Sequence, residues 1–527
     1  MKKKSFVAGA LILTLAGIIA KILGAVFRIP LTLLLGAEGI GIYQLIFPIY
    51  ALFLVISSSG IPVALSKIIS KENSKKNYKN IQIIFETSLF LMFVLGLCFT
   101  ILIIILSRTI ASLQNNINIF ICYIAIAPAI LFATLISAYR GYFQGLEIMK
   151  FSAVSQVIEQ LFKLMFGLLF AYLLLKINLV MGVLGAVLGV SLSETLTIIY
   201  LLICFKKKKV QLDENEGELI TYKHAFKFIL KEATPITLNA IVSPIVSVID
   251  SLIIIKLLGN IGLDFNLSST LYGLESGVVA SLISLPSIIS VSLGISLMPS
   301  LSSSFALKKT EEVKFKSKLA LKLVWYFTLP CAVIYLLMSK KICFFLYGNL
   351  SSVNINQLEI ASMLLKVSAF SIIYIALNQI VTTIMQAINK SYLPLIVLSC
   401  CSILKIILTI ILVQYETLNI YGLAVSDVIC FGLACFVNLV FMKKYLPLKF
   451  NFYEIFLVPI VSIVGLVGTI YLFQYLLQNF LFNRLVIMLI IFSAFVVYLI
   501  LVVLLKGFSN KEIDKTKLLK FMKNKKY

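Results

Sequence analysis

Apolar runs of about 20 residues recur along the whole chain, and this feature constrains the fold more than any other. An α-helix needs about 20 apolar residues to cross the hydrocarbon core of a bilayer. Of the 527 residues, 61% are hydrophobic and only 13% are charged, so a soluble fold would lack the polar surface to cover its core. Strands of a β-barrel would alternate every second residue, and runs such as "TILIIILS" do not. The sequence therefore predicts an all-α integral membrane protein.

The same length rule predicts about 14 transmembrane helices. Twelve of them would form two pseudo-symmetric six-helix lobes, and the last two would be extra C-terminal helices. The approximate centres of the predicted spans are Ala20, Leu54, Leu95, Ile130, Lys163, Glu194, Pro244, Pro286, Ala332, Tyr374, Ile403, Cys430, Ile463 and Val496.

The net charge of +24 comes from lysines and arginines that lie mainly on one side of the predicted spans. Basic loops stay in the cytoplasm, and an even number of spans places both termini on that side. We therefore expect a multi-pass protein of the cytoplasmic membrane with both termini in the cytoplasm. The start, "MKKKSF", leads into an apolar run without an A-x-A cleavage site, so the first helix should remain as a span. The opposite side would hold about five basic residues, namely Arg108, Lys176, Lys340, Lys341 and Arg484.

Two segments in the two halves of the chain align without a gap. "FQGLEIMKFSAVSQVIEQLFK" ends at Lys163, and "MQAINKSYLPLIVLSCCSILK" ends at Lys405. Internal repeats of this kind build many transporters, whose substrate sites lie between the repeats. The predicted parts are an N-terminal lobe (1–205), a cytoplasmic linker (206–228), a C-terminal lobe (229–442), and two extra helices with a basic tail (443–527).

The sequence shows no set of residues suited to catalysis or to metal binding. It contains no GxxxxGK[ST] and no HExxH motif, and its one histidine, His224, lies in a polar loop. The nine cysteines have no CxxC spacing. A membrane glycosyltransferase or polymerase would normally have a large outer loop with acids or a histidine, and the predicted outer loops are short. We therefore expect a protein that is not an enzyme, without a cofactor or a metal.

Ionisable residues inside the spans are the candidate functional residues, because intramembrane charges generally face a cavity or a partner. Lys21 and Arg28 are seven residues apart, so they lie on one face of the first helix. Lys163 and Lys405 are further candidate cations. Lys163 has an alternative structural role, because Glu159 is four residues away and the two could pair along their helix.

Acidic residues in the spans are candidates for counter-charge or ion coupling. These are Asp250, Glu159 and Glu275. Asp250 could also pair with Lys21 and Arg28. Glu194, Lys366 and Asp427 are expected to lie near an interface, where long polar side chains reach water.

Proline and glycine residues interrupt corresponding spans in the two halves. Breaks at matching positions are typical of the moving helices that face the substrate in transporters. Pro30 lacks a backbone donor, so we expect a kink beside Arg28. The candidate gating positions are Pro30, Gly60, Pro62, Pro286, Gly294 and Pro299.

A basic cavity of low dielectric would attract an anion such as phosphate or pyrophosphate. Such a cavity accounts for the presence of Lys21 and Arg28 in a spanning helix, where each would cost about 2.5–3.5 kcal/mol on insertion scales. The sequence therefore favours a carrier of a phosphorylated substrate.

Three blocks of the sequence resemble a known family. The segment "LILTLAGIIAKILGAVFRIPLTLLLGAEGIGIYQLIFPIYALFLVISSSGIPVALSKIIS" is similar to the start of the sporulation and polysaccharide-exporter branch of the multidrug/oligosaccharidyl-lipid/polysaccharide superfamily, which includes lipid II flippases. "YRGYFQGLEIMKFSAVSQVIEQLFK" and "SLPSIISVSLGISLMPSLS" resemble its second and third markers. The resemblance covers most of the chain and is weakest after about Lys443.

This resemblance implies a flippase of the bacterial cytoplasmic membrane that moves an undecaprenyl-pyrophosphate-linked sugar by alternating access. The implied cargo is a peptidoglycan precursor such as lipid II, used for the spore cortex, and the implied partners are membrane lipids and cell-wall synthesis enzymes, with the chain as a monomer. Alternative cargoes are capsule, exopolysaccharide or teichoic-type repeat units, and a further alternative is an ion-coupled multidrug exporter.

The resemblance also bears on the site. Lys21 falls on the first of two cavity arginines in the first helix of lipid II flippases, and Arg28 lies one residue past the second. The basic residue of the family's eighth helix has no counterpart in "LESGVVASLISLP". This departure counts against lipid II in particular, but not against lipid-pyrophosphate cargo in general.

Overall fold

The computed structural model describes residues 3–75, 77–207, 220–348, 355–448, 451–478 and 483–508, and all regular secondary structure in these ranges is helical. This confirms the predicted all-α class. The helices are α1 (Lys3–Ser58), α2 (Gly60–Ser74), α3 (Tyr78–Leu113), η1 (Ile117–Ile119), α4 (Phe120–Gly145), α5 (Met149–Leu175), α6 (Leu179–Lys207), α7 (Tyr222–Asn260), α8 (Phe265–Tyr272), η2 (Gly273–Val279), α9 (Ala280–Ala306), α10 (Thr310–Tyr347), α11 (Ile355–Ala387), α12 (Tyr392–Val413), α13 (Tyr421–Tyr445), η3 (Tyr453–Leu457), α14 (Val458–Leu476) and α15 (Arg484–Leu504).

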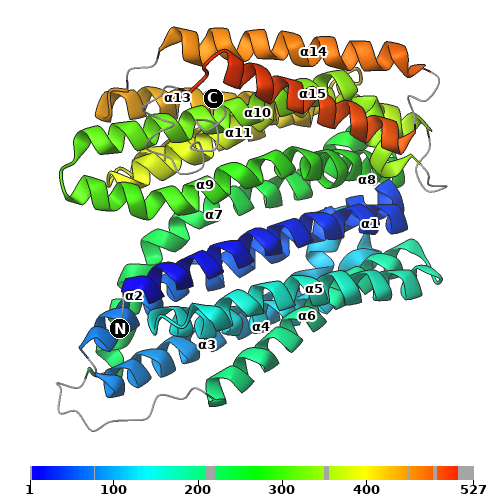
Figure 1. Ribbon diagram of the computed structural model, residues 1–527. Coiled ribbons are helices and arrows are strands. Elements are labelled where there is room, and N and C mark those ends of the chain that lie inside the picture. The colour runs from blue at the N-terminus through cyan, green and yellow to red at the C-terminus, as the bar shows by residue number, and fades with distance from the viewer. Residues whose placement is uncertain are drawn as a thin grey trace. The chain divides into compact units, whose positions relative to one another are not determined.

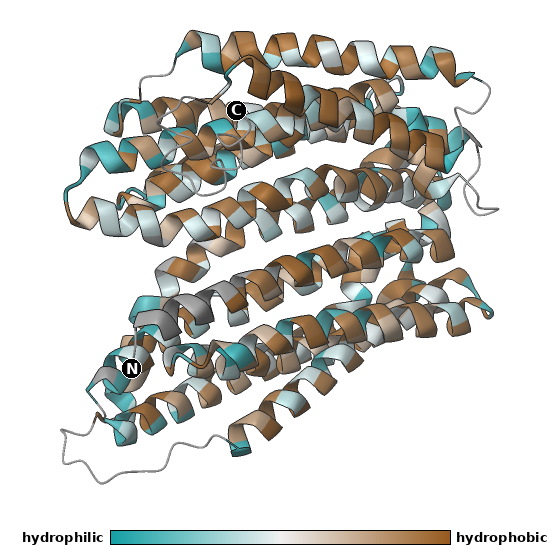
Figure 2. Cartoon of the chain, viewed as in Figure 1, coloured by the Kyte–Doolittle hydropathy of each residue, from teal (hydrophilic) through white to brown (hydrophobic). Residues whose placement is uncertain are grey.

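Within the described ranges, 13 helical stretches are long and apolar enough to cross a membrane. Figure 2 shows the apolar residues along the middle of the helices and hydrophilic residues mainly near their ends. The first stretch, Leu15–Asn73, has 59 residues. As one straight helix it would be about 90 Å long, three times the hydrocarbon thickness. Because this length is enough for two crossings, the 13 stretches agree with the expected number of about 14.

The division of this first stretch lies at Gly36. Its φ of 70° and ψ of −179° are not helical, and they separate two arms of α1, 3–35 and 37–58. A positive φ suits glycine because glycine has no Cβ. Pro30 and Pro48 lie inside the helical arms. The kink expected beside Arg28 stays a prediction, because a proline can bend a helix while its own φ and ψ remain helical. The break with non-helical φ and ψ inside α1 lies further along the chain, at Gly36.

The chain divides into two compact units. The first comprises Met1–Ser281 with Thr409–Ile420, and the second comprises Leu282–Leu408 with Tyr421–Tyr527. Within each unit the helices lie side by side as long rods (Figure 1). The helices α7 and α8 belong to the first unit, although the sequence repeat would group them with the second lobe. The four-part division drawn from the sequence stays a prediction.

Each unit has its own apolar core. In the first unit, one cluster joins α1, α4 and α6 through side chains such as Leu31, Tyr123 and Val187. In the second unit, Leu301, Val324 and Ile380 belong to a cluster that joins α9, α10 and α11 with α13. Because lipid tails are as apolar as these side chains, close packing rather than hydrophobic burial holds such helices together in a membrane.

Glycines bring α5 and α6 into close contact. A Cβ added to Gly189 would lie 2.3 Å from the Cα of Gly167, and a Cβ added to Gly185 would lie 2.3 Å from the carbonyl oxygen of Phe170. Both distances are too short for any side chain. Small residues four apart allow this approach of two membrane helices. The contact fixes α5, which carries Glu159 and Lys163, against α6.

The extra C-terminal helices are tied to α10 by buried polar contacts within the second unit. Lys322 is fully buried, and its Nζ donates to Glu454 at 2.7 Å. Trp325 Nε1 donates to the carbonyl of Ile455 at 3.0 Å. The hydroxyl of Tyr326 donates to the carbonyl of Glu454. These contacts hold the segment η3 and the following α14 against one face of α10.

Candidate functional site

Lys21 and Arg28 both lie on the first arm of α1, but their surroundings differ. Lys21 is exposed on the protein surface, and Arg28 is partly buried. The guanidinium of Arg28 donates to the hydroxyl of Ser281 at 3.2 Å. In the described part of the chain neither cation forms an ion pair with a carboxylate, so the alternative pairing with Asp250 is not observed.

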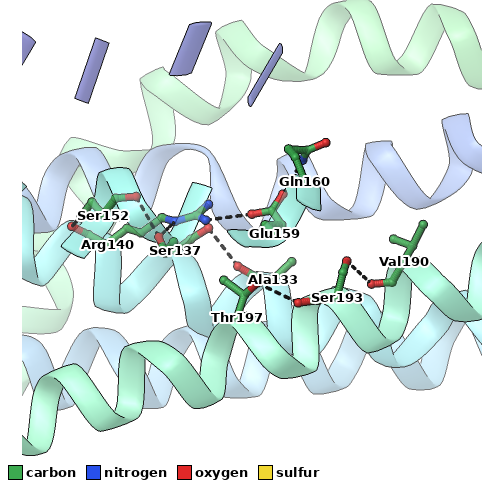
Figure 3. Close-up of polar contacts among 10 residues, drawn as sticks. Ala133, Ser137, Arg140, Ser152, Glu159, Gln160, Val190, Ser193 and Thr197 are labelled. Atoms are coloured by element: carbon green, nitrogen blue, oxygen red, sulfur yellow. Dashed lines mark hydrogen bonds and ion pairs between the residues drawn. The ribbon is translucent and has the colours of Figure 1, made fainter. Parts of the chain in front are cut away.

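A cluster of charged and polar side chains lies inside the first unit, between α4 and α5. Arg140 of α4 pairs with Glu159 of α5, with 2.8 Å between Nη2 and Oε2, and both side chains are less than one-fifth exposed. The Nε of Arg140 donates to the hydroxyl of Ser155 at 2.8 Å. Gln160 Nε2 donates to the other carboxylate oxygen of Glu159 at 3.0 Å. Figure 3 shows Arg140 extended toward Glu159, with Gln160 beside it.

Glu194 brings a second acid to this cluster from α6. It is 5% exposed, and it interacts electrostatically with Tyr50 on the second arm of α1. It also interacts electrostatically with Glu159, Arg140 and Lys163. The prediction that Glu194 lies near an interface is therefore wrong. Hydropathy alone does not show that α6 turns this residue toward α1 and α5.

Lys163 lies on α5 over two aromatic rings. Its Nζ is 4.9 Å from the centre of the Phe47 ring and 5.5 Å from that of Phe27. Stacking over aromatic rings stabilises a cation without neutralising it. The expected pairing of Lys163 with Glu159 along the helix does not occur, because Arg140 and Gln160 take the oxygens of Glu159.

Lys405 lies in the second unit and has a different environment. Its Nζ is 2.9 Å from Oδ1 of Asp427, and the two side chains are 8% and 26% exposed. The partner comes from α13, whereas Lys405 is on α12. The sequence shows no acid within one helical turn of Lys405, and the structure supplies one from the neighbouring helix. Lys366, in contrast, is exposed on α11.

The remaining candidate acids are buried in the first unit. Asp250 lies on α7, and Glu275 lies in η2, a π-helical segment between α8 and α9. A π-turn inside a helix is frequent at functional sites. The carbonyl of Ser276 in this segment accepts a hydrogen bond from Gln44 of α1.

The candidate gating positions fall into two groups. Gly60 begins α2, where a Cβ would lie 2.2 Å from the carbonyl oxygen of Ala233, and Pro62 lies in the same first turn. The other group, Pro286, Gly294 and Pro299, lies within the continuous helix α9. The interruption expected at these positions is not observed, and the irregular turn of this span lies earlier, in η2.

Sequence reasoning missed Arg140, Tyr50 and Gln160. Arg140 lies in "YRGYFQG", which the sequence marks only by its resemblance to a family block. An arginine flanked by apolar spans is itself a signal of an intramembrane partner. Tyr50 carries no charge, so only its contact with Glu194 reveals its role.

Comparisons with known proteins agree with this fold. A family model described as "Polysaccharide biosynthesis protein" matches residues 6–305. The chain belongs to this polysaccharide biosynthesis protein family. A second model, MatE, matches residues 235–411.

Two curated proteins of Bacillus subtilis (strain 168) are similar to this chain over most of its length. It is 24% identical to stage V sporulation protein B over 458 residues, 86% of each chain. It is also 24% identical to the lipid II flippase MurJ over 423 residues, 77% of each chain. An inward-facing multidrug resistance MATE transporter of the MOP superfamily has the same fold, with a TM-score of 0.65 and 14% identity over 85% of this chain and 98% of that chain. The chain is thus a multi-pass membrane protein, and one of these relatives is named a lipid II flippase.

Proposed function

We propose that this protein is a flippase for an undecaprenyl-pyrophosphate-linked sugar precursor in the bacterial cytoplasmic membrane, and not an enzyme. The names of two relatives, lipid II flippase and stage V sporulation protein B, support a peptidoglycan precursor as cargo, with use in the spore cortex. Transport by alternating access fits the fold of the transporters that the chain resembles. Both termini would face the cytoplasm.

The observation that supports this proposal most is that two cations of the first unit, Arg28 and Lys163, form no ion pair within the described ranges. Arg28 bonds to a neutral serine, and Lys163 lies over aromatic rings. Within the described ranges neither is in an ion pair, although both lie in spanning helices. An unpaired cation in a membrane is costly, so its retention indicates an anionic ligand. A pyrophosphate is such a ligand, and the two side chains would hold it together with Lys21.

The acids of the first unit would have a supporting role. Glu159, Asp250 and Glu275 are buried or partly buried there. We propose that they balance the cations while no substrate is bound, or couple transport to an ion. Lys405 has a carboxylate partner at 2.9 Å, so it would contribute less to substrate binding than Lys163.

The test measures flipping of a fluorescent polyprenyl-pyrophosphate disaccharide in proteoliposomes. The double variant Arg28→Ala and Lys163→Ala should lose at least about 90% of the rate, since two charge-assisted contacts to phosphate are removed. Lys366→Ala is the matched control, because this exposed lysine of α11 should keep the wild-type rate. A full rate in the double variant would remove the proposed site.

Lipid carriers with different sugars distinguish the cargoes. Faster flipping of a peptidoglycan precursor than of a capsule, exopolysaccharide or teichoic-type unit would support the leading cargo. A second candidate function, ion-coupled export of cationic drugs, is favoured by one observation, the buried acid Glu194 beside Glu159. Transport of a cationic dye that competes with no polyprenyl lipid would support that alternative.

A further inference from the structure

Arg140 joins α4 to α5 through several contacts. Its Nη2 bonds to Glu159, its Nε bonds to the hydroxyl of Ser155, and its backbone carbonyl accepts from Ser152 at 3.2 Å. The two side-chain donors, Nε and Nη2, point in fixed directions because the guanidinium is planar. Figure 3 shows this set of contacts on one side of α5. Arg140 is therefore held in one orientation, with one arm directed at Glu159.

Glu159 and Lys163 are one helical turn apart on α5, with the glutamate on the N-terminal side. This spacing and order favour an ion pair along the helix. Such a pair would neutralise Lys163 and occupy its ammonium group. In the structure both oxygens of Glu159 are already engaged, Oε2 by Arg140 and Oε1 by Gln160. Lys163 instead lies over the rings of Phe47 and Phe27.

The other charged group near Lys163 is Glu194 of α6. It interacts electrostatically with Lys163 and with Tyr50, and within the described ranges its oxygens are more than 4.0 Å from the lysine nitrogen. Among the described residues, the groups near Lys163 are Phe27 and Phe47 of α1, Glu194 of α6, and Glu159 one turn away on its own helix. Of the two acids, only Glu159 has the helical spacing for a direct pair.

We propose that Arg140 is a positioning residue that holds Glu159 away from Lys163 and so keeps the Lys163 ammonium available for an anionic headgroup. This rests on the proposed flippase function for the nature of that headgroup. Without Arg140, Glu159 loses its cation, and the lysine one turn away is the next available partner. The pair that forms would then compete with the phosphate of the substrate.

Three variants test this inference: Arg140→Gln, Glu159→Gln and the double variant. The apparent KM for a polyprenyl-pyrophosphate lipid should rise about tenfold in Arg140→Gln, equal to about 1.4 kcal/mol. The apparent KM should return to within about twofold of wild type in the double variant, because a glutamine at position 159 cannot neutralise Lys163. This expectation concerns KM alone, since the loss of a carboxylate that couples transport to an ion would change kcat. Arg140→Lys, which keeps the charge but not the fixed fork, should have an intermediate value.

A second readout needs no substrate. Reductive methylation of Lys163, followed by peptide mass spectrometry, reports whether its amine is free or paired. Methylation should be several-fold slower in Arg140→Gln and should recover in the double variant. Thermal melting of each variant identifies loss of the fold, and Arg140→Lys replaces Arg140→Gln if the latter does not fold.

The outcomes separate the two proposals. Wild-type protein that transports no polyprenyl lipid would contradict the proposed function, and the methylation series would still decide the role of Arg140. If adding Glu159→Gln to Arg140→Gln restores neither the apparent KM nor the methylation rate, the proposed role of Arg140 is overturned and the flippase function is unaffected.

Discussion

At the scale of single residues, Lys163 and Lys405 correspond in the two halves of the chain but have different neighbours. Lys163 and Lys405 are separated by a fixed number of residues in the sequence. The same separation relates Leu179, the start of α6, to Tyr421, the start of α13, and it relates Gly185 to Asp427. In the second unit the aspartate neutralises Lys405. In the first unit the same position is a glycine in contact with the backbone of α5, so Lys163 has no such acid.

This difference predicts a structural role for Lys405. Lys405→Met should lower the free energy of unfolding by about 2 kcal/mol, because it leaves Asp427 charged and partly buried without its cation. The double variant Lys405→Met and Asp427→Leu should recover most of this loss, since replacing both members of a buried pair is often neutral. Thermal melting in detergent measures the stability.

The flipping rate of that double variant completes the test. A rate equal to wild type is expected if Lys405 serves only the fold. A stable double variant without transport would show instead that Lys405 contacts the substrate.

At the scale of helices, the glycine contact between α5 and α6 sets where the polar cluster lies. Gly167 of α5 and Gly189 of α6 lie against each other with no space for a side chain. Glu159 and Lys163 of α5 are less than three turns from this contact. The packing of these two helices therefore determines the distance from Lys163 and Glu159 to Glu194.

Gly189→Val should destabilise the protein by about 3 kcal/mol, because its added atoms overlap the backbone of Gly167. Gly468→Ala is the matched control. Gly468 lies in α14, where an added Cβ has no neighbour within 4 Å, so alanine should be neutral or stabilising by up to about 1 kcal/mol. Equal melting temperatures for both variants would contradict the close α5–α6 packing.

At the scale of the whole molecule, the number of crossings depends on the first 58 residues. One crossing in α1 gives 13 spans and places the termini on opposite sides, whereas two arms divided at Gly36 give 14 and place both on the basic side. The excess of lysine in the terminal and linker segments favours the second arrangement.

Reporter fusions decide between these arrangements. Green fluorescent protein fused after Tyr527 should fluoresce, because it folds in the cytoplasm, and alkaline phosphatase fused after Asn115, between α3 and α4, should be active outside. Phosphatase activity at the C-terminus together with a cytoplasmic N-terminus would mean an odd number of crossings and would refute the division at Gly36.

The sequence by itself determined the class of protein, the approximate number of spans and the family resemblance. These follow from the sum of many local contributions, because the length and hydropathy of each run decide whether it enters the membrane regardless of its neighbours. It also identified Arg28, Lys163 and Glu159 as unusual, since any charge within such a run stands out.

Only the tertiary structure decided which charges meet. Arg140 pairs with Glu159 and so leaves Lys163 without this partner, Asp427 neutralises Lys405, and Tyr50 interacts electrostatically with Glu194. Each pair joins two different helices, and its formation depends on the rotation and depth at which those helices pack. Periodicity within one segment does not contain that information, so the sequence showed where charges lie but not which of them remain available to a substrate.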